Sequence, residues 1–170
     1  PCPGWLPSQL AVDTGNDETM SALSTRLGEP VSTVVSGTPQ QVARLLEKAT
    51  GGAAGPLFDV IVLDEAGQLD VAHAVLTLAG AAPGASLIVA GDPLQLPPIH
   101  QCPPPLGLES LVGSVFAFFQ DWHQVPVDAL TVNYRSNRQI VDLAREAGYP
   151  PSLQPAYPDQ RIEWSAAPSP

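Results

Sequence analysis

An apolar run that ends in two carboxylates constrains this chain more than any other feature. Residues 60–63, VIVL, lead directly into Asp64 and Glu65. An unbroken run of this length predicts a strand that is buried on both faces. Open α/β sheets bind ligands beyond the carboxyl ends of their strands, so the two acids are predicted to lie where such a site forms. The alternative is a buried strand followed by an acidic turn that carries no chemistry.

Two adjacent carboxylates at a strand end suit metal-assisted phosphoryl transfer. One can hold Mg²⁺ through its water shell, and the other can position or deprotonate an attacking water. A second strand pattern, residues 87–90, also ends in an acid, Asp92. The sequence therefore places a second carboxylate loop after a second strand.

Strand and helix patterns alternate along most of the chain, which predicts an α/β fold with a mainly parallel sheet and helices on both faces. The sharpest local signal is Thr38, followed by Pro39 and by Gln41 three positions on, which is typical of a capped helix start. Ser136 and Gln139 are predicted to cap a later helix in the same way. Helices are predicted over residues 17–27, 38–49, 70–81, 108–119 and 137–147, and strands over residues 31–36, 60–63, 87–90 and 129–132.

Three of these helices have an apolar face that is predicted to be buried. The face of the helix after Thr38 is predicted to lie on the sheet, and the phenylalanines at 116, 118 and 119 are predicted to belong to the core rather than to a base-stacking platform. The last helix is predicted to bury Ile140, Leu143, Ala144 and Ala147. Beyond residue 150 the chain is rich in proline, and at most a strand near residues 161–164 is expected.

Charge is distributed unevenly along the 170 residues. Residues 1–130 carry 13 acidic and 3 basic residues, whereas residues 131–170 carry 4 of each, and the net charge is −10. This balance argues against a broad nucleic-acid-binding surface, because such a surface needs Lys and Arg facing phosphates. It also indicates that the segment from about Thr131 is a different module.

Cysteine usage and hydropathy indicate the cellular compartment in which the protein is expected. Cys2 and Cys102 lie far apart with no CxxC, so neither a zinc site nor a disulfide framework is indicated, and a reducing, cytoplasmic location is expected. Residues 71–91 lack Asp, Glu, Lys and Arg, but Pro83 and Gly84 divide them into a helix and a strand, so no membrane span is predicted. The start at Pro1 without Met leads us to expect a fragment of a longer protein.

Three motifs, in order, resemble those of a known family. LDEAGQ at 63–68, GDPLQLPP at 91–98 and NYRSN at 133–137 look like motifs II, III and IV of superfamily 1 DNA and RNA helicases. VSTVVSGTPQQV, at 31–42, is similar to the strand, turn and helix with a Ser/Thr phosphate contact that precedes motif II. The first two motifs are most similar to the branch that contains the RNA-surveillance and 5′-to-3′ DNA helicases, and NYRSN resembles the DNA-repair helicases about equally.

The resemblance, which covers about residues 31–148, implies a RecA-like P-loop NTPase core that is only partly contained in this chain. Residues 1–128 would be the C-terminal part of a first RecA-like domain, and residues 129–170 the start of a second domain with a Pro-rich tail. The implied activity is that of a helicase or translocase that hydrolyses ATP with Mg²⁺ and moves along single-stranded DNA or RNA.

The resemblance also assigns roles to residues of the first two motifs. Asp64 would hold Mg²⁺, and Glu65 would act on the attacking water. Gln68 and Gln95 would sense the γ-phosphate and pass its state to the nucleic-acid groove, with Asp92 helping to fix their network. The alternatives are that Gln68 only caps the following helix and that Gln95 makes a structural hydrogen bond.

Three further residues have roles of this kind. Arg135 would act on the γ-phosphate as an arginine finger does, and Tyr134 would stack on the nucleotide or on a neighbouring base. The alternative for Arg135 is an ordinary surface arginine. Thr38 is foremost a helix cap, with a contact to a nucleic-acid phosphate as a secondary role.

One departure from the family pattern matters. No GxxxxGK[ST] loop occurs, and the single lysine, Lys48, lies within a predicted helix, where it cannot grip phosphates. The chain by itself is therefore expected to be inactive as an ATP hydrolase. The two accounts that remain are a fragment of a helicase and a degenerate, non-hydrolysing binding or scaffold module.

Overall fold

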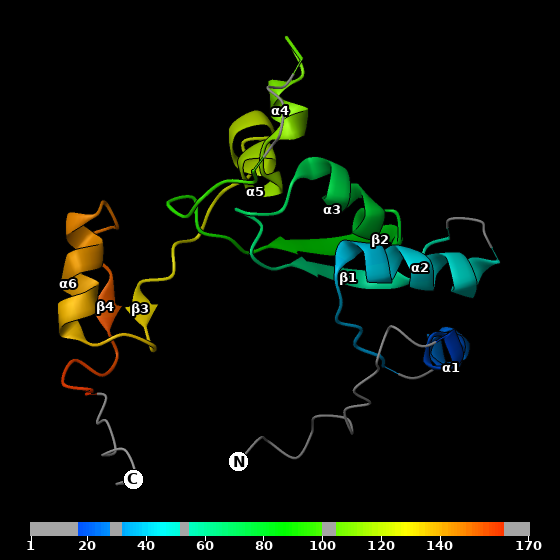
Figure 1. Ribbon diagram of the computed structural model, residues 1–170, viewed down its shortest axis with the longest axis horizontal. Helices are drawn as coiled ribbons and strands as arrows, with labels where there is room; N and C mark the ends of the chain where they lie inside the picture. Colours follow the sequence, from blue (N-terminus) through cyan, green and yellow to red (C-terminus); the bar gives the residue numbers. More distant parts are fainter. Residues whose placement is uncertain (1–16, 28–31, 52–54, 100–104, 162–170) are drawn as a thin grey trace, which may run out of the picture. The chain divides into compact units, whose positions relative to one another are not determined.

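The chain divides into two compact units, Pro1–Gln124 and Val125–Pro170. The computed structural model describes residues 17–27, 32–51, 55–99 and 105–161 (Figure 1). The division falls a few residues before the predicted boundary between 128 and 129. The secondary structure of both units mixes short parallel sheets with helices, as expected for an α/β chain.

The centre of the first unit is a β-α-β segment. Strand β1 (Phe58–Leu63) is followed by helix α3 (Val71–Leu78) and by strand β2 (Ala81–Val89), and the two strands pair in parallel with Ile61 opposite Leu87. The predicted parallel pairing is confirmed. The turn predicted at Pro83 and Gly84 instead lies inside β2, as an irregularity of the strand. Between the paired positions Phe58–Ala81 and Val60–Ser86, β2 advances by five residues and β1 by two.

Only one face of this sheet is buried. Ile61 and Leu63 are 5% and 4% exposed, whereas Val60 and Val62, which point the other way, are 55% and 59% exposed. The prediction of strands buried on both faces is therefore wrong for β1, and Ile88 of β2 is also largely exposed. The reason is that α3 and the segment around Phe116 cover one face, and no other described element buries the opposite face. The buried core of this face consists of Ile61, Leu63, Ala66, Ala74, Val115 and Phe116.

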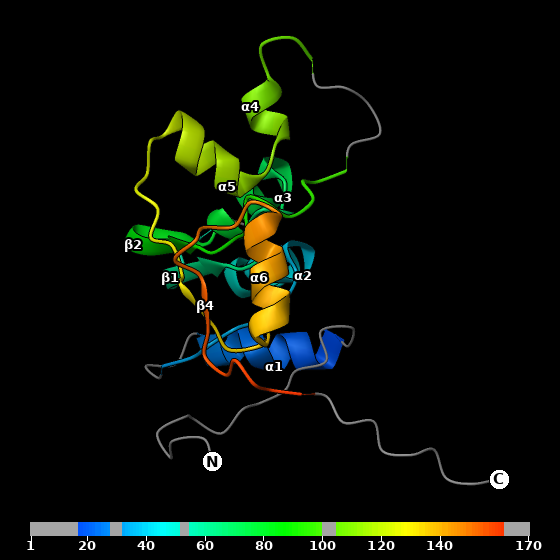
Figure 2. The ribbon, with the colours of Figure 1, turned by 90° about the vertical axis from the view of Figure 1, so that its left-hand side faces the viewer.

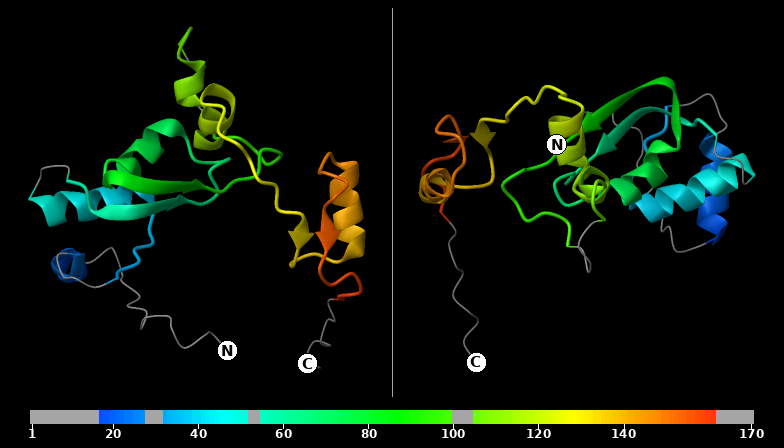
Figure 3. Two further views of the ribbon diagram at one scale, coloured as in Figure 1. Left: turned by 180° about the vertical axis from the view of Figure 1, so that it is seen from behind. Right: turned by 90° about the horizontal axis from the view of Figure 1, so that it is seen from above.

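Two helices at the start of the first unit form a separate small core. Helix α1 (Asp17–Leu27) has the predicted bounds, and helix α2 (Pro39–Thr50) begins at the predicted cap. Met20 and Leu23 of α1 pack with Leu45 of α2. Helix α2 thus packs against α1 and also against α3, as the ribbons in Figure 3 show. The prediction had placed its buried face on the sheet.

The strand predicted over residues 31–36 is absent from its described part, residues 32–36. Val34 is 87% exposed, and only Val35 packs against the small core of α1 and α2. β-Branched residues form a strand where a neighbouring strand accepts their backbone hydrogen bonds, and this segment has no such neighbour among the described residues. Val31 lies outside them.

The helix predicted over residues 108–119 is broken into three pieces. They are α4 (Glu109–Val112), α5 (Val115–Ala117) and the π-helical turn η1 (Phe118–Trp122). The break falls at Ser114, whose side chain accepts the amide of Ala117, while the amide of Val115 donates to the carbonyl of Leu69 at 2.8 Å. Tertiary hydrogen bonds to the loop after β1 thus interrupt a continuous apolar pattern. Figure 2 shows α4 and α5 as separate helices. Phe116 is buried, as predicted for the core.

The second unit is a short parallel pair with one helix. Strands β3 (Val132–Asn133) and β4 (Gln154–Pro155) pair in parallel, and helix α6 (Arg138–Glu146) lies between them in sequence. The predicted strand over 129–132 is reduced to its end, and β4 was not predicted. The strand suggested near residues 161–164 lies almost wholly outside the described residues.

Two details of α6 differ from the prediction. Its cap is Asn137, whose side chain accepts the amide of Ile140 at 3.2 Å, and not Ser136. Its buried residue is Val141, whereas Ile140 and Leu143 are 53% and 64% exposed. Among the residues of this unit up to 161, the short β3–β4 pair is the sheet against which α6 packs, so one narrow stripe of the helix is covered. Across both units, no described helix is long and apolar enough to span a membrane.

Candidate functional site

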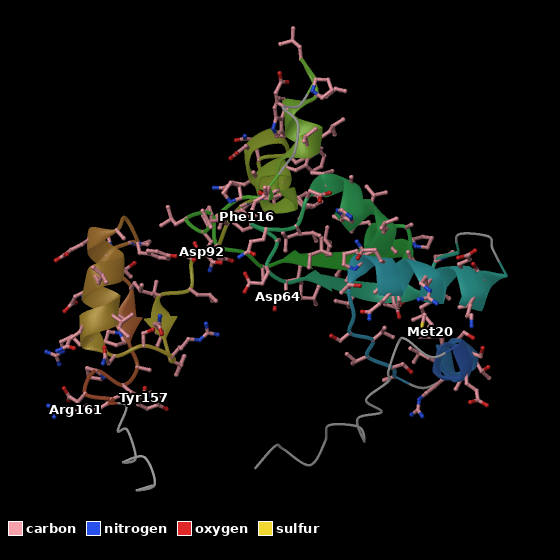
Figure 4. The ribbon with its side chains drawn as sticks, viewed as in Figure 1. Met20, Asp64, Asp92, Phe116, Tyr157 and Arg161 are labelled. Atoms are coloured by element: carbon pink, nitrogen blue, oxygen red, sulfur yellow. The ribbon has the colours of Figure 1, made fainter. Side chains whose placement is uncertain are left out.

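The loops that carry LDEAGQ and GDPLQLPP begin side by side, at the carboxyl ends of β1 and β2. The amide of Ala90 donates to the carbonyl of Leu63 at 2.9 Å, and the amide of Ala66 donates to the carbonyl of Ala90 at 2.8 Å. The parallel ladder therefore continues into both loops. Asp64 and Asp92 lie at the arrowhead ends of the two strands (Figure 4).

A chain of side-chain hydrogen bonds joins the two loops. The side-chain nitrogen Nε2 of Gln68 donates to Oε1 of Gln95 at 2.9 Å, and Nε2 of Gln95 donates to Oδ2 of Asp92 at 3.2 Å. We call these three residues the amide relay. The alternative that Gln68 caps the next helix is wrong, because Asp70 caps α3 by accepting the amide of His73 at 2.8 Å. The two residues predicted as sensors, Gln68 and Gln95, thus contact each other, and Gln95 contacts Asp92, which was predicted to help fix their network.

Asp92 also shapes its own loop. Its Oδ1 accepts the amide of Leu94 at 3.0 Å, and its carbonyl accepts the amide of Gln95 at 3.2 Å. A side chain that bonds the backbone two residues ahead is the usual way in which Asp closes a tight turn. The carboxylate therefore orients Gln95 through the backbone as well as through the side chain.

Two glycines allow the loops to approach each other, and the sequence analysis did not single them out. A Cβ on Gly67 would lie 2.7 Å from the carbonyl oxygen of Asp92, and a Cβ on Gly91 would lie 2.7 Å from the amide nitrogen of Gly67. Both obstacles are backbone atoms, so neither can move aside cheaply. The signal that could have found them is a glycine within about four residues of each strand end, one in each motif.

Glu65 has a strained backbone. Its φ is 53°, in the left-handed region that non-glycine residues rarely adopt. The amide of Glu65 donates to Oδ1 of Asp64 at 3.0 Å, and its carbonyl accepts the amide of Gln68 at 2.9 Å. Such a conformation costs on the order of 1–3 kcal/mol and is concentrated at functional sites in proteins. Both carboxylates are exposed at the end of β1.

The donor set at this site fits Mg²⁺ in part. Mg²⁺ takes oxygen ligands and is commonly held by one or two carboxylates together with water and substrate phosphates. Asp64 supplies an exposed carboxylate of which one oxygen is engaged by the neighbouring amide. Among the described residues no group of three His, Cys, Asp or Glu side chains is arranged to hold a metal ion. A metal at this position would therefore depend on Asp64, water and phosphate oxygens.

Lys48 is placed as the sequence analysis predicted, within a helix. It lies in the last turn of α2, and its ammonium group donates to the hydroxyl of Ser21 on α1 at 3.5 Å. Thr38 is also placed as predicted, at the start of the same helix. Its hydroxyl accepts the amide of Gln41 at 3.3 Å, while the Gln41 side chain accepts the amide of Thr38 at 2.7 Å. The capping role of Thr38 is confirmed, and its contact with nucleic acid stays a prediction.

The NYRSN motif lies in the second unit, where it forms a turn after β3. The side chain of Asn133 accepts the amides of Arg135 and Ser136 at 2.9 and 2.8 Å. Tyr134 and Arg135 project from this turn and are exposed. They border an open depression of about 560 Å³, whose lining residues are Leu130, Val132, Asn133, Tyr134, Arg135 and Leu153.

Comparison with known proteins gives no family assignment. The chain matches no protein-family model, and no curated protein shows significant sequence similarity to it.

Proposed function

We propose that this chain is part of an ATP-dependent nucleic-acid helicase or translocase that couples ATP hydrolysis to movement along single-stranded DNA or RNA. The observation that carries the proposal is the amide relay. Two loops that resemble consecutive helicase motifs meet at adjacent strand ends and exchange hydrogen bonds through Gln68, Gln95 and Asp92. Uncharged amides that both donate and accept are suited to register the presence or loss of a phosphate group.

The two carboxylates after β1 have distinct parts in the proposed reaction. Asp64 would hold Mg²⁺, which when bound neutralises charge on the phosphate oxygens. Glu65 would accept a hydrogen bond from the attacking water and take its proton. The left-handed conformation of Glu65 supports this part, because it fixes the direction in which the carboxylate leaves the strand.

The second unit would contribute Arg135 and Tyr134. Arg135 carries a planar guanidinium on a turn whose backbone Asn133 fixes, and the residue is exposed to solvent. Such a group stabilises charge that grows on a transferred phosphoryl group. Tyr134 would stack on the base of the nucleotide or on a base of the strand.

A second function, a binding or scaffold module without hydrolysis, is favoured by one observation. The chain contains no GxxxxGK[ST] loop, and its only lysine serves the contact between α1 and α2. Mg²⁺-ATP affinity at sites of this kind depends largely on such a loop and its lysine. A module of this kind would bind a strand and would not turn over ATP.

ATP hydrolysis by the complete product of the gene that encodes this chain separates the two functions. We expect hydrolysis that requires Mg²⁺ and rises when single-stranded DNA or RNA is added. Asp64→Asn should reduce it by a factor of about 100 or more, because one ligand of the metal is weakened. The matched control is Asp59→Asn, an exposed acid on the same strand, which should hydrolyse ATP as the unaltered protein does. Strand binding without any hydrolysis would refute the helicase proposal and support the binding module.

A further inference from the structure

Two tyrosines of the second unit contact each other while most of each side chain remains in solvent. Tyr134 follows β3 and Tyr157 follows β4, and their ring centroids are 6.3 Å apart in an edge-to-face arrangement of 68°. Tyr134 is 69% exposed and Tyr157 is 59% exposed. Aromatic rings contribute most to folding when they are buried, so an exposed pair leaves much of its stacking surface unused within this unit.

Backbone hydrogen bonds hold the segment around Tyr157 against the segment around Tyr134. The amide of Ala156 donates to the carbonyl of Asn133 at 2.8 Å. On the other side of Tyr157, the carbonyl of the following proline accepts the amide of Arg138 at 3.1 Å. Each tyrosine is thus next to a residue that is fixed by the other segment. The two backbone segments that carry the rings are therefore held together without a ligand.

The surroundings of this pair combine apolar surface with one guanidinium. The depression beside Tyr134 is lined by Leu130, Val132 and Leu153 together with Asn133 and Arg135. Apolar and aromatic walls suit the face of a planar base, and a guanidinium fork suits a phosphate. The charge of this part of the chain does not oppose an anion, because residues 131–170 carry equal numbers of acidic and basic residues.

We propose that Tyr157 and Tyr134 form one stacking platform for an aromatic base, with Arg135 beside it for the attached phosphate. The ligand is a nucleotide unit, either free or within a single strand. Tyr157 is the new residue of this site: no motif of the sequence contains it, and it reaches Tyr134 because β3 and β4 pair in parallel. The inference rests on the proposed function for the choice of a nucleotide, and it deepens that function by naming a base-binding residue.

The three tyrosines of the chain provide a direct measurement. In the 170-residue chain labelled with ¹³C-tyrosine, ring signals of Tyr134, Tyr149 and Tyr157 can be followed while single-stranded oligodeoxyadenylate, ATP or inorganic pyrophosphate is added. We expect the signals of Tyr134 and Tyr157 to shift together and to saturate with the two ligands that carry a base. Tyr149, which follows α6 and is not part of the proposed platform, should not shift. The ligand that saturates at the lower concentration identifies the source of the nucleotide unit.

Two variants of Tyr157 test its part in binding. Tyr157→Leu should weaken binding of the better ligand roughly 5- to 100-fold, since one stacked ring is lost. Tyr157→Phe should bind as the unaltered chain does, because stacking uses the ring and not the hydroxyl. The control is Trp122→Leu, which removes an exposed aromatic side chain of the first unit and should leave binding unchanged.

Several outcomes would overturn the inference. They are a shift of Tyr134 without Tyr157, unchanged binding by Tyr157→Leu, equal shifts with pyrophosphate, and no shift with any ligand. If Tyr157→Leu does not fold, the ring signals of the unaltered chain and the binding of Tyr157→Phe still decide. The measurement detects binding and not turnover. Ring shifts in the 170-residue chain, together with no ATP hydrolysis by the complete gene product, would therefore refute the proposed function and leave this site standing.

Discussion

The two regions that carry the motifs are built in opposite ways. At the ends of β1 and β2, the motif side chains bond to one another, from Gln68 through Gln95 to Asp92. In the NYRSN turn, the motif side chains that bond inward hold only backbone groups. Asn137 caps α6 and donates to the carbonyl of Gln160, and Asn133 accepts two backbone amides. Tyr134 and Arg135 are left exposed on the turn that this side chain fixes.

This difference indicates a division of labour. The side-chain amides of Gln68 and Gln95 both donate and accept hydrogen bonds, and their network changes when one of these bonds is exchanged for a bond to a ligand, so the first region is suited to sensing. A rigid turn that presents a guanidinium and an aromatic ring is suited to binding charge and a planar base. The predictions that follow test each half of this comparison, beginning with the largest effect.

Among the four changes that compare the two regions, removal of the Arg135 guanidinium should have the largest effect. In the complete gene product, Arg135→Ala is expected to slow ATP hydrolysis on the order of 1,000-fold with a modest loss of nucleotide affinity, because charge on the γ-phosphate grows in the transition state. Steady-state and single-turnover hydrolysis rates measure this effect. The control is Arg138→Ala, another exposed arginine of the same unit. Equal rates for the two variants would mean that Arg135 is an ordinary surface residue.

The close approach of the two loops in the first region can be tested by a substitution that adds one methyl group. Gly91→Ala places a Cβ 2.7 Å from a backbone nitrogen and is expected to lower the free energy of unfolding by roughly 1–3 kcal/mol. Urea denaturation followed by circular dichroism measures the change. Gly113→Ala is the control, because its Cβ would meet only one carbonyl oxygen at 3.7 Å. If both variants lose the same stability, the contact between the loops is looser than described.

The turn of the second region should depend on one side chain. Asn133→Ala removes the acceptor of two backbone amides, and we expect it to destabilise this unit by about 1–2 kcal/mol. Protection of the amides of Arg135 and Ser136 from hydrogen exchange would fall in parallel. Gln139→Ala, an exposed position on α6, should leave both quantities as they were. Undiminished protection in Asn133→Ala would show that the turn is held by other groups.

The smallest effect concerns the amide relay. Gln68→Leu, Gln95→Leu and the double variant form a cycle in which we expect a coupling free energy of roughly 0.5–1 kcal/mol, because the bond between the two amides lies near the surface. Thermal or urea unfolding of the four proteins gives this quantity. A coupling indistinguishable from zero would remove the distinction between the two regions, because the side chains of the first region would then be as independent as those of the second.

Local signals in the sequence were sufficient for several elements. Thr38, Pro39 and Gln41 specify a helix start by hydrogen bonds among neighbours, and the structure has that start. The apolar run after residue 58 and the pattern before Asp92 gave two strands, and the intervening helix made their parallel pairing the expected one. The position of the acidic loops at the strand ends followed from the same pattern.

Features that depend on distant partners were not predictable in this way. The exposure of Val60 and Val62 is decided by whether another element covers that face, and a run of apolar letters does not contain this information. The break at Ser114 is fixed by hydrogen bonds to a loop more than 40 residues earlier. The same holds for Tyr157, which reaches Tyr134 through the pairing of two strands of two residues each. Gly67 and Gly91 are present in the two motifs, but the reason that glycine is needed there is found only in the structure, where the two loops lie side by side.

The central claim is that Glu65 acts on the attacking water, and Glu65→Gln tests it most directly. In the complete gene product, equilibrium binding of Mg²⁺-ATP and single-turnover hydrolysis are measured for this variant and for Glu47→Gln, an exposed glutamate on α2. We predict that Glu65→Gln binds Mg²⁺-ATP nearly as the unaltered protein does and hydrolyses it about 100- to 10,000-fold more slowly, since the base is lost while the metal ligand remains. Glu47→Gln should behave as the unaltered protein in both measurements. Hydrolysis at the unaltered rate by Glu65→Gln would contradict the account.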